Sequence, residues 1–77
     1  MLRRYKTVPD LKAHESAAAI SFVDPALACK LTAMGVRPGA VIEMIRKAPF
    51  GKAYYIKVDG IRLALREEEA FSILLEI

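Results

Sequence analysis

The strongest constraint on the fold is a short hairpin signal in the second half of the chain. Two segments that alternate between large apolar side chains and polar or small ones, residues 53–58 and 61–66, are separated only by Asp59 and Gly60. An Asp-Gly pair between alternating segments favours a tight two-residue turn. Because a slip of one residue would turn three large apolar side chains to solvent, the turn also sets the strand register. The sequence therefore predicts an antiparallel β-hairpin here.

Three further segments have the pattern of strands. Residues 17–23 end in β-forming side chains, and residues 73–77 alternate, with Leu74 on the outward side. Residues 40–47 carry apolar side chains at both parities, which is typical of a strand covered on both faces. Together with the hairpin, these segments predict five strands.

One helix is predicted at about residues 25–34. Asp24 can accept a hydrogen bond from a free N–H of the first turn, and Pro25 at the first helical position has no N–H to satisfy. Gly35 can adopt the positive φ that ends a helix. Three apolar side chains spaced at i, i+4 and i+7 form a stripe that faces a core, namely Leu27, Leu31 and Met34.

The length of the chain decides how these elements must pack. Ordering 77 residues costs roughly 1.5 kcal/mol each, so nearly every apolar side chain, 55% of the chain, has to be used. Five short strands bury little as an open sheet, but a rolled sheet with the helix over one opening removes most edges. We therefore predict a mainly β fold, a small five-stranded barrel with a helix at 25–34 and a short helical turn at about 67–71, where three glutamates suit a first turn. It forms a single domain over residues 1–77, of which 1–7 are expected to be flexible.

The sequence predicts neither a membrane span nor export. The longest uninterrupted apolar runs are four residues, whereas a span needs about 20. The basic residues 1–6 lead to Pro9 and Asp10 instead of an apolar segment, so they are not a secretion signal. The single cysteine cannot form an internal disulfide, which favours the cytosol. We expect a cytoplasmic domain.

The net charge of +3 is distributed unevenly. Residues 37–66 contribute +5 (seven Lys and Arg against Glu43 and Asp59), and residues 67–77 contribute −4. A basic block can serve as a surface for nucleic acid or anionic lipid, or it can supply solvated outward faces and guarded edges for strands. Because no Arg/Gly tract or motif of stacking aromatics accompanies the charge, the second interpretation is favoured and no nucleic acid is expected.

The residues for catalysis or for a firm metal site are missing. The chain has one His and one Cys, His14 and Cys29, and a small packed barrel leaves little room for the cleft that a nucleophile pair needs. We predict no enzymatic activity and no cofactor. A structural zinc site needs four ligands, so Cys29 is expected to be a buried packing residue. His14 is the weak metal candidate, through a site shared between subunits with Glu15 or Asp10.

Two apolar side chains are expected near the surface. Phe50 lies in a Pro-Phe-Gly loop, and Leu74 lies on the outward side of the last strand. Apolar anchors beside charges that steer encounter are typical of interaction surfaces, although both side chains could instead cover an end of the barrel. We predict a partner-binding surface from these two residues and three basic neighbours, Arg46, Lys47 and Lys52.

Several motifs in a fixed order resemble the FeoA family of ferrous iron transport proteins, small cytosolic domains with an SH3-like barrel. The match covers about Val8 to Ile77. Its motifs lie at residues 10–11, 31–39, 48–51, 58–60, 63–66 and 69–70. Two positions depart, His14 where the family usually has Gly and Ala53 where Pro is frequent. Because His tolerates positive φ better than a branched residue, the turn at His14 is expected to survive.

The resemblance implies an accessory to FeoB, the membrane ferrous iron permease that carries a cytosolic GTP-binding domain. We therefore expect a non-catalytic regulatory module of ferrous iron uptake that docks on the cytosolic part of that permease, with iron only as the transported ion. SH3-like barrels are also found attached to iron-dependent repressors, so association with a transcriptional regulator or nucleic acid is the alternative. Direct binding of ferrous iron and weak homo-oligomerisation are left open.

Overall fold

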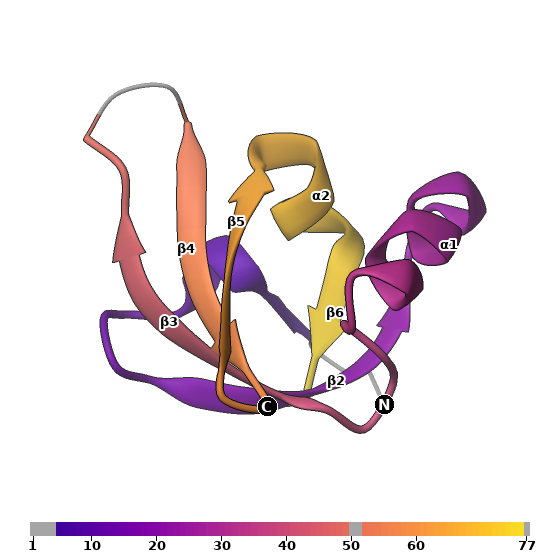
Figure 1. The fold of residues 1–77 in the computed structure, drawn as a ribbon, viewed down its shortest axis with the longest axis horizontal. Helices are drawn as coiled ribbons and strands as arrows, with labels where there is room; N and C mark the ends of the chain where they lie inside the picture. The colour runs from indigo at the N-terminus through magenta and orange to yellow at the C-terminus, as the bar shows by residue number, and fades with distance from the viewer. Residues whose placement is uncertain (1–4, 50–51, 77) are drawn as a thin grey trace.

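In the part of the chain that the structure describes, six strands and two α-helices build the domain. The computed structural model describes residues 5–49 and 52–76. The strands are β1 (Lys6–Thr7), β2 (Ser16–Phe22), β3 (Val41–Lys47), β4 (Ala53–Val58), β5 (Ile61–Arg66) and β6 (Ile73–Leu75), and the helical segments are η1 (Val8–Asp10), α1 (Pro25–Ala33) and α2 (Glu67–Ser72). The strands form one antiparallel sheet in the order β1-β6-β2-β3-β4-β5, which curls toward the two helices (Figure 1). The predicted mainly β fold, with its helix and its short helical turn, is confirmed.

The additional strand, β1, was not predicted. Both of its residues pair with β6, and the chain then turns into η1, where the Asp10 carboxylate accepts a hydrogen bond from the Thr7 N–H at 2.9 Å. A two-residue strand has no alternation to detect, which is why the sequence pattern indicated five strands. Of the segment 1–7 that we expected to be flexible, residues 1–4 lie outside the described part, while Lys6 and Thr7 belong to the sheet.

The β4–β5 hairpin forms as the sequence indicated. Asp59 and Gly60 have φ of 51° and 79°, and Val58 pairs with Ile61 across the turn. The alternation holds, since Ile56 and its same-face neighbours turn inward while the intervening side chains are exposed. Ile61 is an exception at 59% exposure, because it lies at the turn end of the edge strand.

β3 is covered on one face only, although its sequence indicated burial on both. Ile42 and Met44 are fully buried, whereas Val41 is 55% exposed. Neither α1 nor α2 packs on the outer face of β3, so apolar side chains at the other parity remain near solvent.

Helix α1 begins and ends as predicted. The Asp24 Oδ1 accepts a hydrogen bond from the Ala26 N–H at 2.9 Å. At the other end Gly35 has a φ of 100°, and the N–H of Val36 donates to the Leu31 carbonyl at 2.9 Å. This is the Schellman arrangement, in which a residue with positive φ turns the chain so that N–H groups beyond the helix bond the free carbonyls of its last turn. Val36 and Leu31 are both fully buried, so the helix end is also an apolar contact.

Cys29 is exposed, and the expectation that it is a packing residue was wrong. Helix α1 is docked by one stripe, in which Leu31 is buried and Leu27 is half-buried. Cys29 follows Leu27 by two positions, which places it about 200° around the helix. Leu27 and Leu31, the apolar residues near Cys29 in the sequence, therefore lie on a different face of the helix.

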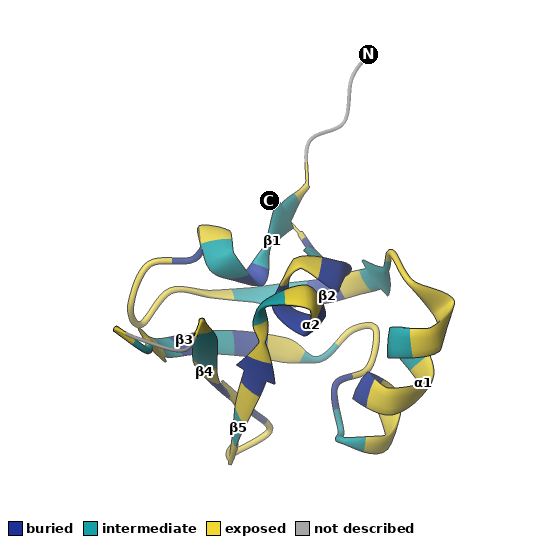
Figure 2. Ribbon diagram, turned by 90° about the horizontal axis from the view of Figure 1, so that it is seen from above, coloured by how far each residue is buried: buried dark blue, intermediate teal, exposed yellow. Residues whose placement is uncertain are grey.

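The core lies between the inner face of the sheet and the two helices. Figure 2 shows buried positions on α2, β5 and α1. Its largest fully buried side chains are Val8, Leu11, Leu31, Val36, Ile42, Met44, Ile56, Leu65, Ile73 and Leu75. Within residues 5–49 and 52–76, every buried side-chain nitrogen and oxygen has a hydrogen-bond partner, and no helix is long and apolar enough to cross a membrane.

A buried carboxylate joins the two helices. Glu69 of α2 is 3% exposed, and its Oε2 lies 2.6 Å from the Nζ of Lys30 on α1. Its Oε1 accepts a hydrogen bond from the Arg66 N–H at 2.8 Å. The Lys30 ammonium, and then the Arg66 amide, hold the pKa of Glu69 below its ordinary value. The charged form of Glu69 therefore stabilises the folded domain.

The helix end allows a first test of stability. Apart from Gly35 and its two neighbours in the chain, no described residue has an atom within 4 Å of the position that a Cβ would take on Gly35, so replacing Gly35 with Ala adds only the cost of positive φ. We expect Gly35→Ala to lower the free energy of unfolding by about 1 kcal/mol, measured by urea denaturation. The control Thr32→Ala, on the exposed side of the same turn, should change it by less than about 0.5 kcal/mol. A neutral Gly35→Ala would contradict the helix-end assignment.

The buried carboxylate of Glu69 allows a second test of stability. Glu69→Gln keeps an acceptor for the Arg66 amide but removes the charge paired with Lys30, and should cost on the order of 1 kcal/mol near pH 7. Because the folded-state pKa is lowered, this stabilisation is complete above the unfolded value of 4.5 and is lost as the pH falls below it.

Denaturation at several pH values would therefore show a smaller loss of stability below pH 4.5 for Glu69→Gln than for the parent domain. Glu68→Gln, at the exposed neighbouring position, is the matched control and should follow the parent. Equal acid sensitivity of the Glu69 variant and the parent would contradict the assignment.

Candidate functional site

The outer face of β3, β4 and β5 contains a hollow of about 420 Å³, which we call the groove. Its lining comprises Ile45, Arg46, Tyr55, Ile56, Arg62, Leu63 and Ala64. The hollow arises where Ala64, a small side chain, stands directly opposite Tyr55. Among the described residues the lining is mostly apolar, and its charged groups are two guanidinium groups, with no carboxylate, thiol or imidazole. This composition is suited to binding.

A bulge in β3 brings Arg46 to the groove. Met44 pairs with Ile56, but Arg46 pairs with Tyr55, so Ile45 is one extra residue on the β3 side. The Arg46 Cζ lies 5.2 Å from the centroid of the Tyr55 ring, a cation–π distance. The bulge thus aligns a cation with an aromatic ring at one wall of the groove.

On this face one cross-strand pair carries like charges and the neighbouring pair carries opposite charges. Lys57 of β4 is directly opposite Arg62 of β5, and like charges in that position are unfavourable. Glu43 of β3 lies opposite Lys57 on its other side. Within the described ranges, neither Arg46 nor Arg62 has a carboxylate within ion-pair distance. The groove consequently presents two unneutralised guanidinium groups to anionic groups of a ligand.

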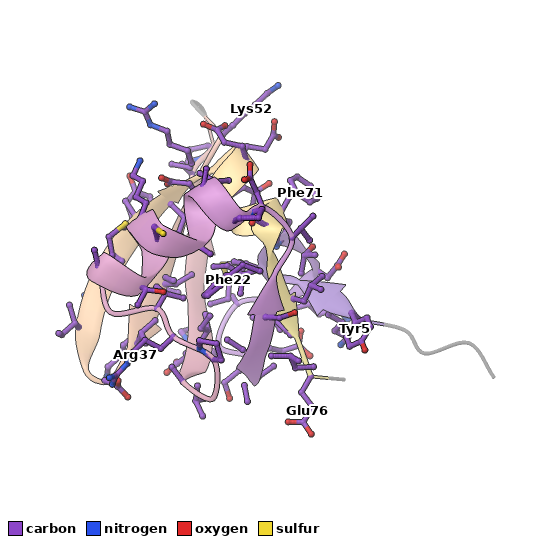
Figure 3. All side chains as sticks on the ribbon, turned by 90° about the vertical axis from the view of Figure 1, so that its right-hand side faces the viewer. Tyr5, Phe22, Arg37, Lys52, Phe71 and Glu76 are labelled. Carbon is purple, nitrogen blue, oxygen red and sulfur yellow. The ribbon has the colours of Figure 1, made fainter. Side chains whose placement is uncertain are left out.

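The basic residues predicted for partner binding lie at the end of the β3–β4 hairpin. Arg46 and Lys47 end β3, and Lys52 precedes β4 with its Nζ 3.9 Å from Glu67 Oε1. Figure 3 shows Lys52 at one end of the molecule and Arg37 near the opposite end. Of the predicted residues that the structure describes, Arg46 alone lines the groove. Phe50 lies outside the described residues, so its role stays a prediction.

Leu74 lies apart from this region. Its strand, β6, is hydrogen-bonded to β1 on one side and β2 on the other, and β2 separates it from β3 in the sheet. Leu74 is half-buried, between the fully buried Ile73 and Leu75. The structure therefore does not bring Leu74 together with Arg46 in the groove.

His14 forms a turn, as the sequence indicated. Its φ is 70°, and its N–H donates to the Met44 carbonyl at 2.7 Å, so the turn persists without glycine. Its side chain is exposed, with Nδ1 3.9 Å from Glu43 Oε2. Glu15, one of its proposed metal-binding companions, accepts a hydrogen bond from the Lys12 N–H. Within the described ranges, no group of three or more His, Cys, Asp and Glu side chains is placed to hold a metal ion.

Six groove residues were not among the predicted site residues, and three of them have outward side chains on the β4–β5 hairpin, namely Tyr55, Arg62 and Ala64. A signal for them was available, because the two-residue turn sets the pairing of Tyr55 with Ala64, and alternation places both side chains outward. The bulge at Ile45 had no such signal. Its position depends on how β3 fits two neighbours at once.

Comparison with known proteins places these features in a family. A family model described as the FeoA domain matches residues 6–77. A search of curated proteins found no match. The FeoA-like protein of Clostridium acetobutylicum has a TM-score of 0.86 at 26% identity, over 99% of this chain and 90% of that chain. The FeoA of Stenotrophomonas maltophilia, solved with zinc and described as a procaryotic SH3 domain protein, has a TM-score of 0.78 at 30% identity, over 92% of this chain and 89% of that chain.

The same fold occurs within larger proteins. A manganese-dependent transcriptional repressor matches with a TM-score of 0.82 over 92% of this chain and 40% of its own length, at 11% identity. A likeness at that identity concerns the fold alone. The predicted SH3-like fold is confirmed by the FeoA structures. Because the family model spans nearly the whole sequence, this chain belongs to the FeoA family.

Proposed function

We propose that this domain is a non-catalytic accessory module of ferrous iron uptake that docks, on the cytosolic side, on a FeoB-type permease. Membership of the FeoA family links the chain to ferrous iron transport. For the Stenotrophomonas maltophilia relative, a role as a ferrous iron transport activating factor has been suggested. The observation that carries the docking proposal is the apolar groove with its two unneutralised arginines.

The composition of the groove supports docking over chemistry. Tyr55 and Ile45 offer apolar contact area, and the Arg46 and Arg62 guanidinium groups offer hydrogen bonds suited to carboxylates. Aromatic and arginine side chains contribute most to protein interfaces. A partner surface with an apolar side chain beside acidic groups would fit this lining.

The predicted residues at the β3–β4 loop extend this surface. Lys47 and Lys52 add positive charge next to Arg46, and charges at the rim of an interface raise the rate of encounter. We include Phe50 as a further anchor on the basis of its place in the loop sequence. Leu74 is proposed only as a separate, second contact, because its strand lies away from the groove.

Variants of the groove test the proposal. Tyr55→Ala removes the aromatic wall and Arg46→Glu reverses a charge, so each should weaken binding of a FeoB-type cytosolic domain about tenfold or more. The dissociation constant can be measured by biolayer interferometry, with Lys52→Glu and Phe50→Ala as tests of the loop.

Arg37→Glu makes the same charge reversal at a residue that does not line the groove, near the end of the molecule opposite Lys52, and is the matched control. We expect it to bind within about twofold of the parent domain. Parental affinity of the Tyr55 and Arg46 variants would refute the groove as the docking site, and no binding by the parent domain would refute the proposed function.

The alternative, association with nucleic acid, is favoured by the same basic face, on which Lys57 lies opposite Arg62. Such binding would weaken steeply as salt increases. We expect no retardation of a 30-base-pair DNA duplex or a single-stranded RNA at about 50 mM salt, measured by gel shift. Retardation that disappears toward about 200 mM salt and is lost in Arg62→Glu would replace the docking proposal with this alternative.

A further inference from the structure

β5 is an edge strand of the sheet. It pairs with β4 alone, at the end of the strand order, and Figure 2 shows it at the outer border of the molecule. Arg62, Ala64 and Arg66 are exposed along it. Edge strands present unpaired backbone groups that can template another strand. The edge is therefore a surface with its own binding capacity, next to the groove.

The turn determines which backbone groups point outward. In a hairpin with a two-residue loop, the flanking residues, Val58 and Ile61, exchange both hydrogen bonds, and the pattern then alternates along the strands. Ile61, Leu63 and Leu65 are therefore bonded to β4, while Arg62 and Ala64 direct their N–H and C=O groups to the free edge. These outward groups form no hydrogen bond with any other part of the chain that the structure describes. The Arg66 N–H is already taken by Glu69.

The residues whose backbone groups point to the free edge also carry the side chains that line the groove. Because residues of one parity share a face, the side chains of Arg62 and Ala64 lie on the outer face, where they line the groove. Arg66 has the same parity, so Ala64 lies between two guanidinium-bearing positions. A strand added here would place its own alternate side chains directly beside these three.

We propose that the β5 edge accepts an extended segment of a partner as an added antiparallel strand, with the pattern acidic–x–large apolar–x–acidic. The two acidic side chains would lie opposite Arg62 and Arg66, where opposite charges are favourable. The central apolar side chain would lie beside Ala64 and reach over it toward Tyr55, which stands directly opposite Ala64 on β4. The inference deepens the proposed function and rests on it for the identity of the partner.

A second copy of this chain fits the edge poorly. If β5 paired antiparallel with β5 of another copy, centred on Ala64, each Arg62 would lie opposite an Arg66. Like charges directly opposite destabilise a strand pair. The charge pattern therefore favours an acidic segment over self-association.

A peptide titration tests the inference directly. The probe is an acetylated and amidated heptapeptide with Glu, Leu and Glu at positions two, four and six and Thr elsewhere. We expect it to shift the ¹H–¹⁵N resonances of Arg62 and Ala64 and to slow hydrogen exchange of both amides. Replacing both Glu with Lys should abolish binding, and Arg62→Gln should weaken it about two- to fivefold. Lys12→Gln, which is outside the groove, should leave it unchanged.

Backbone pairing is tested separately from charge. A peptide N-methylated at its central Leu cannot donate to the Ala64 carbonyl and should bind about tenfold more weakly. On the protein side, Ala64→Pro removes an outward N–H that edge strands can spare, and it should lower affinity, whereas Ala64→Ser keeps the donor and should not. If Ala64→Pro fails to fold, the N-methylated peptide gives the same information.

The outcomes separate this inference from the docking proposal. Absence of binding at millimolar peptide, or binding that leaves the Arg62 and Ala64 amides unshifted and tolerates N-methylation, would overturn the added strand. If a FeoB-type cytosolic domain still bound and depended on Tyr55, the docking function would stand. If the peptide bound through the edge but the cytosolic domain did not bind, the edge would stand and its assignment to the permease would fall.

Discussion

The register of the β4–β5 hairpin is the constraint on which the rest of this domain depends. With Asp59 and Gly60 both at positive φ, the turn determines which side chains enter the core and which face solvent. The same register places Ala64 opposite Tyr55 and so creates the groove. It also decides that Arg62 and Ala64 direct their backbone groups to the free edge. One two-residue turn thus organises core, groove and edge together.

The opposite side of the core is held by a different kind of interaction. Helices α1 and α2 are short, and neither could be stable alone. Burial of Leu31 and Val36 at the end of α1, together with the Glu69–Lys30 ion pair, ties both helices to the sheet. Lys30 keeps about half of its side chain exposed, so the cost of desolvation falls mainly on Glu69, where the Lys30 ammonium and the Arg66 amide offset it. The two helices therefore cover the small core, and the outer face of the sheet takes no part in covering it.

Local signals explain how much of this could be predicted. The hairpin, the start of α1 at Asp24 and its end at Gly35 each depend on two to four adjacent residues, and all were correct. The two-residue β1, the bulge at Ile45 and the burial of Glu69 depend on contacts between segments distant in the sequence, and none left a local pattern. Cys29 was misjudged because apolar neighbours in a helix sequence need not share its face. Arg46 was named as a candidate for its charge, and the structure places it in the lining of the groove, but the groove itself depends on the register of three strands.

The pairing of Lys57 with Arg62 couples folding and recognition to ionic strength in opposite senses. Screening by dissolved ions relieves the repulsion inside the hairpin, and it equally weakens attraction between the arginines and an anionic partner. At low ionic strength the repulsion between Lys57 and Arg62 is therefore greatest, and so would be the attraction for the anionic partner that we propose. A carboxylate of that partner beside Arg62 would offset the repulsion, so part of the free energy of the proposed association would come from an unfavourable pair that the free domain already contains.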